Sequence, residues 1–258
     1  LHTPVYFFLC HLPLVDLGNS SAVAPKMLVS CFGERKTISL PGRAAQMYFC
    51  GVCIITECYL LAVITYDRYT AICNPLLYVA TISQKVCAQL AVGSYIVATV
   101  NEILLVSSVF SLHFCGANVI TRFCCDIPPL LKPSCSSTAV NEHVLFTIAT
   151  LIALSTLVFI VVSYGYILTT VLRICSSEGR LEAFSTCASH LTSALFLYRT
   201  MIFMYLHPGS SYSLDQHKVV SVVYTLVIPM LNPLIYSLRN VEAKDALKRL
   251  LETVLVSF

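Results

Sequence analysis

The sequence predicts an all-α membrane protein. Of its 258 residues, 57% are hydrophobic and 11% are charged, and the mean hydropathy is +0.79. Soluble domains carry roughly 25% charged residues. Six apolar segments, with no internal repeat among them, are long enough to cross about 30 Å of hydrocarbon as helices. They span residues 4–30, 42–73, 84–110, 143–174, 183–206 and 217–238.

The first apolar segment carries an acidic residue inside the membrane. Asp16 would cost at least about 2.5 kcal/mol if it faced lipid. The carboxylate is therefore predicted to face the interior of a helix bundle. Pro13 and Pro25 lie in the same segment and are expected to bend the helix.

Segment 42–73 has the pattern of a central, buried helix. One stripe, in steps of three and four residues, holds Cys50, Ile54, Glu57, Leu61, Thr65 and Arg68. Glu57 precedes Arg68 by about three turns, or roughly 16 Å. Arginine keeps its proton, so Arg68 must find a partner or reach the headgroups. If the Asp67-Arg68 pair stood alone, the simpler interpretation would be an arginine whose side chain extends to water at the membrane surface.

The third apolar segment contains Asn101 and Glu102. These two polar residues predict an end that is turned either towards water or towards a neighbouring helix. At the other end of the chain, residues 240–254 alternate apolar and basic side chains with helical spacing. That pattern indicates an amphipathic helix on the membrane surface.

Residues 111–142 form the longest predicted loop. Loops of this length are usually functional or disordered, and four cysteines in one loop favour an oxidising, extracellular side. Zinc is the competing interpretation, but no CxxC spacing supports it. An outer position for this loop puts Asp67, Arg68 and the surface helix in the cytosol. The cysteines are Cys115, Cys124, Cys125 and Cys135, with His113 as the further zinc candidate.

Composition and motifs exclude two classes of function. The net charge of +3 is too small to indicate nucleic-acid binding. The Ser, His and Asp residues form no recognisable nucleophile motif, so no enzymatic activity is expected.

Several motifs, in order along the whole chain, resemble those of vertebrate olfactory receptors, which are rhodopsin-like (class A) G-protein-coupled receptors. The motifs are Leu1–Leu9 (LHTPVYFFL), Thr65–Tyr78 (TYDRYTAICNPLLY), Ser163-Tyr164, Ala183–Leu191 (AFSTCASHL) and Pro229–Asn240 (PMLNPLIYSLRN).

This resemblance implies a bundle of seven transmembrane helices in a single receptor domain. The chain would begin in the first intracellular loop, as an N-terminally truncated fragment. Helices two to seven and the short amphipathic C-terminal helix would then be present. The implied location is the plasma membrane, spanned several times, in the cilia of olfactory sensory neurons.

The implied function is that of an odorant receptor. A small, mostly apolar volatile molecule would bind inside the bundle, and a stimulatory, olfactory-type heterotrimeric G protein would bind at the cytoplasmic side. Membrane lipid would surround the helices. The residues expected to line the ligand site are Cys50, Gly51, Ile54, Tyr198, Met201, Ile202, Tyr205, Val222 and Thr225.

The resemblance also assigns roles to polar residues. It implies a G-protein switch, a sodium site between carboxylates that would otherwise repel, and a disulfide in the long loop. Pro233 breaks a helix hydrogen bond and so provides a pivot. The switch residues are Asp67, Arg68, Tyr69, Tyr164, Asn232, Pro233 and Tyr236. The cation site is Asp16, Glu57 and Asn232, and the disulfide joins Cys115 to Cys135.

Three residues depart from the family pattern. Arg43 replaces the cysteine that normally bridges to the position of Cys125. Arg199 replaces a glycine, and Glu182 replaces a basic residue. One alternative is therefore a receptor product that no longer signals.

The other alternative is a transporter or channel, in which Asp16, Glu57 and Arg199 would be pathway charges. The absence of inverted repeats and the one-sided Asp67-Arg68 motif weigh against this class.

Overall fold

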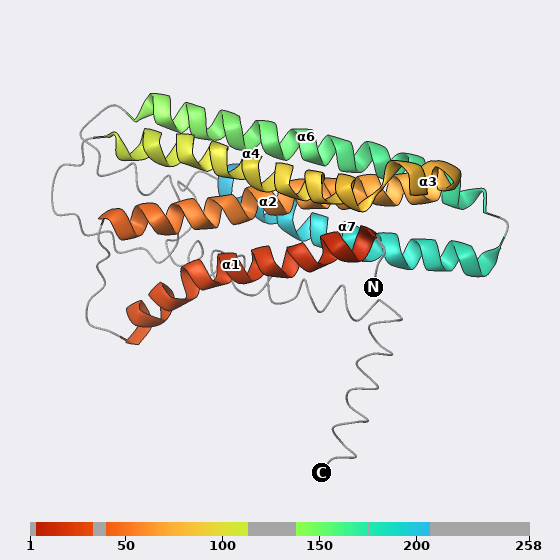
Figure 1. Cartoon of the computed structure of the whole chain (residues 1–258). Coiled ribbons are helices and arrows are strands. Elements are labelled where there is room, and N and C mark those ends of the chain that lie inside the picture. Colours follow the sequence, from red (N-terminus) through yellow and green to blue (C-terminus); the bar gives the residue numbers. More distant parts are fainter. Residues whose placement is uncertain (1–3, 33–39, 113–137, 175, 207–258) are drawn as a thin grey trace, which may run out of the picture.

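The computed structural model describes residues 4–32, 40–112, 138–174 and 176–206, and these residues contain helices and no strands. Most of the helices run side by side in one bundle (Figure 1). They are α1 (Pro4–Phe32), α2 (Leu40–Cys73), the short α3 (Pro75–Thr81), α4 (Gln84–Phe110), α6 (Ala139–Leu172) and α7 (Ser177–Leu206).

Three of these helices are long and apolar enough to cross a membrane by length and composition. They cover Pro41–Cys73, Gln84–Phe110 and Val140–Leu172. The helices α1 and α7 have 29 and 30 residues, which at 1.5 Å per residue also exceeds the hydrocarbon thickness. The predicted segments 217–238 and 240–254 lie outside the described residues.

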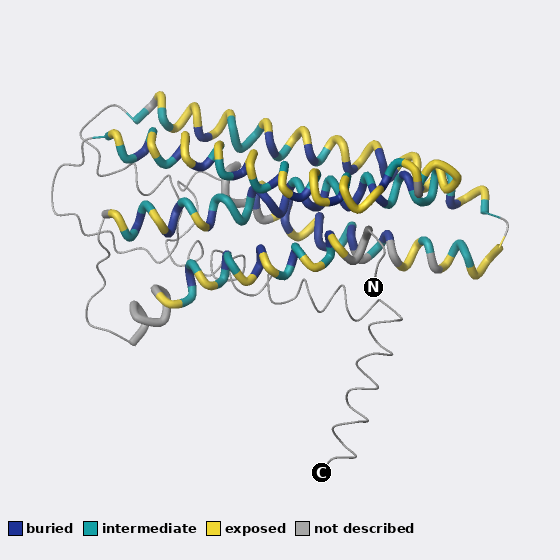
Figure 2. Tube along the Cα trace, in the orientation of Figure 1, coloured by how far each residue is buried: buried dark blue, intermediate teal, exposed yellow. Residues whose placement is uncertain are grey.

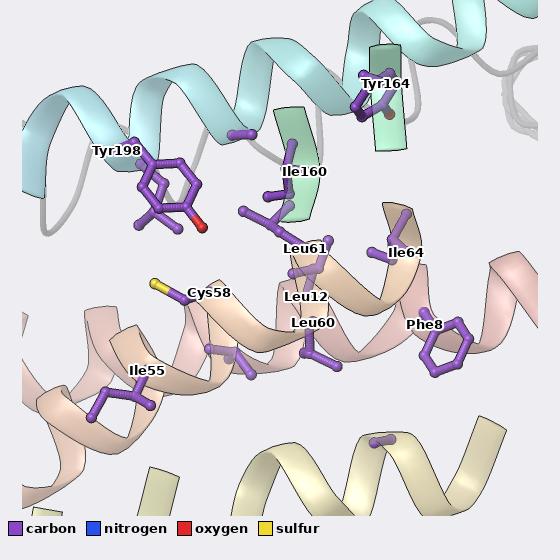
Figure 3. Packing of buried hydrophobic residues seen from close by; sticks show 14 of the residues in the cluster. Phe8, Leu12, Ile55, Cys58, Leu60, Leu61, Ile64, Ile160, Tyr164 and Tyr198 are labelled. Carbon is purple, nitrogen blue, oxygen red and sulfur yellow. The ribbon is translucent and has the colours of Figure 1, made fainter. Parts of the chain in front are cut away.

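α2 is the central helix of the bundle, as its sequence predicts. It contacts α1, α4, α6 and α7. Buried side chains follow the whole length of α2, whereas the outer sides of α4 and α6 are exposed (Figure 2). In the main core, Leu60, Leu61 and Ile64 of α2 cluster with Leu12 of α1 and Ile160 of α6 (Figure 3).

The largest differences from the sequence prediction are the additional helix α3 and the earlier starts of α6 and α7. The loop expected after Pro75 contains α3, because proline suits the first turn of a helix and the N–H of Ile82 closes the last turn on Tyr78 O. α6 begins at Ala139 instead of 143, where Thr138 Oγ1 donates to Glu142 Oε1 at 2.9 Å.

α7 begins at Ser177, before the predicted start at 183. The serine hydroxyl of Ser176 accepts from the N–H of Gly179 at 3.3 Å. Such a side-chain acceptor satisfies one of the free donors of a helix N-terminus. Residues 177–182 are polar and extend the helix beyond the apolar segment. A prediction from hydropathy therefore does not include this first turn and a half.

α1 remains helical through both of its prolines. It diverges from α2 towards its Phe32 end (Figure 1). The two helices approach closely at Gly18, where an added Cβ would stand 3.1 Å from the Sγ of Cys53. A side chain larger than hydrogen at residue 18 therefore needs the α1–α2 contact to open.

Gly18→Leu should destabilise the protein by about 1–3 kcal/mol, the usual effect of overpacking a core. The melting temperature of the detergent-solubilised protein measures the change. Gly165→Leu is the matched control, because Gly165 is exposed on α6 and no side chain or neighbouring helix lies within 4 Å of its Cβ position. Equal melting temperatures for the two variants would contradict the close approach.

Candidate functional site

One end of α2 holds a fully buried acid. Asp67 has an exposed fraction of 0%. The Tyr78 hydroxyl of α3 donates to Asp67 Oδ1 at 2.9 Å, whereas Oδ2 has no hydrogen-bond partner. Burial and the Asp67 carboxylate raise the pKa of Tyr78 above its usual range. The phenol therefore stays protonated at neutral pH and remains a donor.

Arg68 lies beside this acid and faces α7. Its Nε is buried without a hydrogen-bond partner. The guanidinium acts electrostatically on Asp67 and on two buried α7 residues, Cys187 and His190. A permanent cation with an unused donor is suited to exchange partners when the helices move.

Tyr164 of α6 and His190 of α7 form a second buried polar pair. The Tyr164 hydroxyl lies 2.9 Å from His190 Nδ1, and the rings are stacked with centroids 5.8 Å apart. Sequence reasoning assigned Tyr164 to the switch but gave His190 no role. A histidine inside an apolar segment was the available signal.

Tyr69 and Cys73 connect the same end of α2 to α6. The Tyr69 ring packs edge-on against Tyr166, with centroids 6.1 Å apart. The sulfur of Cys73 lies 3.3 Å from Thr170 Oγ1. Four predicted switch residues, Asp67, Arg68, Tyr69 and Tyr164, thus gather at one end of the bundle. Asn232, Pro233 and Tyr236 lie outside the described residues.

Part of the predicted ligand site also comes together. Tyr198 and Met201 of α7 are buried. The Tyr198 hydroxyl donates to Thr156 Oγ1 of α6 at 2.6 Å, and the Cys58 thiol of α2 points at Met201 Sδ, 3.7 Å away. Tyr198 and Cys58 face the same part of the core (Figure 3). Thr156 and Cys58 were missed by sequence reasoning.

The remaining predicted ligand residues have different positions. Cys50 is buried on α2, and Gly51 and Ile54 are half-buried. Ile202 is 48% exposed on α7. The side chain of Tyr205, and all of Val222 and Thr225, lie outside what the structure describes.

The two carboxylates of the predicted cation site lie at one level of the bundle. Asp16 of α1 and Glu57 of α2 are both buried, and both act electrostatically on the Cys53 thiol. Asn19, one turn along α1, is buried with an unpartnered Oδ1. Among the described residues, no group of three or more His, Cys, Asp or Glu side chains is placed to hold a metal ion.

Arg43 is buried near the other end of α2. Its Nη1 donates to Gln46 Oε1 at 3.4 Å, and Gln46 Nε2 donates to the Ala22 carbonyl of α1 at 3.1 Å. Arg199 is exposed on α7. The Glu182 side chain and Cys115, Cys125 and Cys135 lie outside the described part. The seven cysteines whose side chains the structure describes are free thiols.

Comparison with known proteins agrees with this arrangement. The family model described as "Olfactory receptor" matches residues 1–253. The chain belongs to the olfactory receptor family. Its relatives include olfactory receptor 5AR1 of Mus musculus, 53% identical over 251 residues, which are 97% of this chain and 81% of the relative.

Two further olfactory receptors show the same degree of similarity. Olfactory receptor 5G29 of Mus musculus is 51% identical over 249 residues, covering 96% of this chain and 79% of the relative. Olfactory receptor 5AR1 of Homo sapiens is 51% identical over 251 residues, covering 97% of this chain and 81% of the relative.

Family membership confirms several sequence predictions. The protein is an odorant receptor with the transmembrane helix bundle of its family, it is a multi-pass protein of the plasma membrane, and it is not an enzyme. These findings decide against a transporter or channel.

Tyr78→Phe should destabilise this olfactory receptor by about 1–3 kcal/mol, because it leaves a buried carboxylate oxygen without its donor. The melting temperature in detergent measures the loss. Tyr166→Phe removes an exposed hydroxyl and should leave that temperature unchanged. If both variants melted at the temperature of the parent, the buried Tyr78–Asp67 hydrogen bond would not contribute to stability.

Proposed function

We propose that odorant binding in this receptor releases the Asp67–Arg68 end of α2 so that a stimulatory heterotrimeric G protein binds there. The observation that carries the proposal is the contrast at this end: Asp67 is fully buried, whereas Leu76, nine residues further along, is 95% exposed. Residues 67–76 thus carry both a buried acid and an exposed apolar side chain that a partner protein could contact.

The lock consists of two neighbouring hydrogen-bonded pairs. Tyr78 holds Asp67, and His190 engages Tyr164. Arg68 of α2 acts electrostatically on His190 of α7, and its Nε has no hydrogen-bond partner among the described residues. A displacement of α7 separates His190 from Tyr164 and frees Arg68 to reach Tyr164 and the G protein. Tyr69, Asn232, Pro233 and Tyr236 complete the proposed switch.

α3 supplies the docking surface for the G protein. Leu76 and Leu77 are 95% and 62% exposed, and Pro75 fixes the start of their helix. Exposed large apolar side chains next to a functional polar site indicate a protein contact. An apolar side chain at the centre of such a contact contributes most when water is excluded around it.

The proposed ligand is a small, mostly apolar volatile molecule. Its site lies among Cys50, Gly51, Ile54, Tyr198 and Met201, with Ile202, Tyr205, Val222 and Thr225 as further lining residues. Apolar walls with few polar groups suit a neutral small molecule. Because Tyr198 belongs to α7, a ligand there acts on the same helix that carries His190.

A sodium ion is proposed at Asp16, Glu57 and Asn232. Two buried carboxylates repel each other unless a proton or a cation lies between them. Oxygen ligands suit a hard cation, and the unpartnered Oδ1 of Asn19 is one more oxygen at this level. In the long loop, the disulfide Cys115–Cys135 remains part of the proposal.

Leu76→Asp should lower the maximal odorant-evoked cyclic AMP response about tenfold, the effect of losing roughly 1.4 kcal/mol of G-protein binding. Surface expression should not change, because the Leu76 side chain is 95% exposed. Leu76→Met keeps an apolar side chain and should respond like the parent. A full response from Leu76→Asp would exclude α3 as the docking surface.

Replacing extracellular sodium with an organic cation should shift the odorant concentration for half-maximal response at least about fivefold, a typical coupling between sites. Glu57→Gln should abolish the shift, because it removes one of the two carboxylates. Glu142→Gln, which changes an exposed acid, should retain it. A parent receptor insensitive to sodium would rule the cation site out.

A further inference from the structure

A further buried carboxyl group lies between α4 and α2. Glu102 is on the buried face of α4, between Ala98 and Leu105, and is 5% exposed. Its carboxyl group occupies the space where a side chain on Gly51 of α2 would stand: an added Cβ at Gly51 would overlap its Cδ and both oxygens. The sequence left open whether this polar position faces water or a helix, and the structure shows that it faces α2.

The surroundings of Glu102 are apolar. One turn further from the Asp67 end, Met47 of α2 and Leu105 of α4 pack together in a cluster with Val109 and Leu145. In the part of the chain that the structure describes, no hydrogen-bond donor and no cation contacts this carboxyl group.

A buried polar group without a hydrogen bond costs about 2–7 kcal/mol relative to water. Native proteins retain such groups rarely, and each one requires an explanation. An ionisable side chain inside a membrane bundle is most often part of a binding site or pathway. Glu102 has no place in the proposed switch or sodium site, so neither explains it.

We propose that Glu102 is the polar recognition group of the odorant site and selects ligands with an N–H or O–H donor. The inference rests on the proposed ligand site, since Gly51 is one of its lining residues. The glycine lets the carboxyl group lie against α2, beside the lining residues Cys50 and Ile54. The ligand donor then hydrogen-bonds to the carboxyl oxygens, and its apolar part lies along Cys50 and Ile54.

Two hydroxyl groups near this site are already engaged: Tyr198 donates to Thr156 at 2.6 Å, and Thr156 donates in turn to the carbonyl of Ile152. The buried Thr56 hydroxyl of α2 has no partner in the described part of the chain. A hydroxyl both donates and accepts, whereas an ionised carboxylate only accepts, so Glu102 is the group that selects for a donor. A site that is built to accept a hydrogen bond rejects analogues that lack the donor, because its buried oxygens then remain unpaired.

The test is a cyclic AMP response of the full receptor to 1-octanol, octylamine and octanal, together with a broad odorant panel sorted by the presence of a donor. The parent should respond to donor-bearing compounds. Glu102→Ala should raise the half-maximal concentration of donor-bearing compounds at least tenfold. For octanal and other donor-free compounds, the half-maximal concentration should stay within about twofold of the parent value. Glu102→Gln keeps hydrogen-bonding groups but no charge, so it should lose amines more than alcohols.

A second variant and a control separate recognition from folding. Gly51→Ala should displace the carboxyl group and produce the same selective loss. Asn101→Ala changes the neighbouring residue, whose amide donates to its own helix at Val97 O, and should respond like the parent. Surface expression is measured for all four variants.

Two outcomes would overturn the inference: a parent that responds to no donor-bearing compound, or equal responses of the parent and Glu102→Ala to every compound. The proposed function fails differently. Its failure is a loss of all cyclic AMP responses in the parent, donor-free odorants included, whereas an error about Glu102 leaves those donor-free responses intact.

Discussion

The burial of polar and charged side chains along α2 is the constraint on which the rest of the structure depends. A buried carboxylate or guanidinium costs free energy unless partners replace the water it loses. Each buried polar side chain of α2 is therefore expected to have a partner from a neighbouring helix. Tyr78 of α3 meets Asp67, and the Ala22 carbonyl of α1 meets Gln46. At the Cys53 level, Asp16 of α1 and Glu57 of α2 both act electrostatically on the thiol.

Polar and apolar contacts between helices occur at both ends of the bundle. At the Asp67 end, the Tyr164–His190 pair joins α6 to α7 beside the main apolar core. Towards the other end, Asn141 of α6 donates to the Ser108 carbonyl of α4 at 2.7 Å, beside the cluster of Met47 and Leu105. A hydrogen-bonded pair has a few discrete arrangements, so the Tyr164–His190 pair, next to Asp67 and Arg68, is suited to switch.

The departures from the family pattern do not disturb this architecture in the described residues. Arg43 stands in place of a bridging cysteine, yet it is buried and its guanidinium donates to Gln46. Arg199 is exposed on α7, where a charged side chain can extend along the helix towards the headgroups. Neither residue leaves an isolated charge in the core.

The sequence by itself determined the class of protein, the central helix and the family. Those results depend on composition, on helical spacing and on contiguous motifs such as Thr65–Tyr78, all of which are local properties of the chain. The stripe from Cys50 to Arg68 indicated the more buried side of α2, because helix geometry alone puts those residues on one side. Cys50, Glu57, Leu61 and Thr65 are buried, and Ile54 and Arg68 are half-buried.

Tertiary structure decided which side chains meet. No spacing rule connects Tyr164 to His190, Tyr198 to Thr156, or Glu102 to Gly51, because each pair joins two helices whose relative rotation is set by packing. Helix ends were also decided there: polar residues 177–182 continue α7 through backbone hydrogen bonds and a serine cap that hydropathy does not detect. Pairing between helices is a property of the assembled bundle, and the local sequence does not contain it.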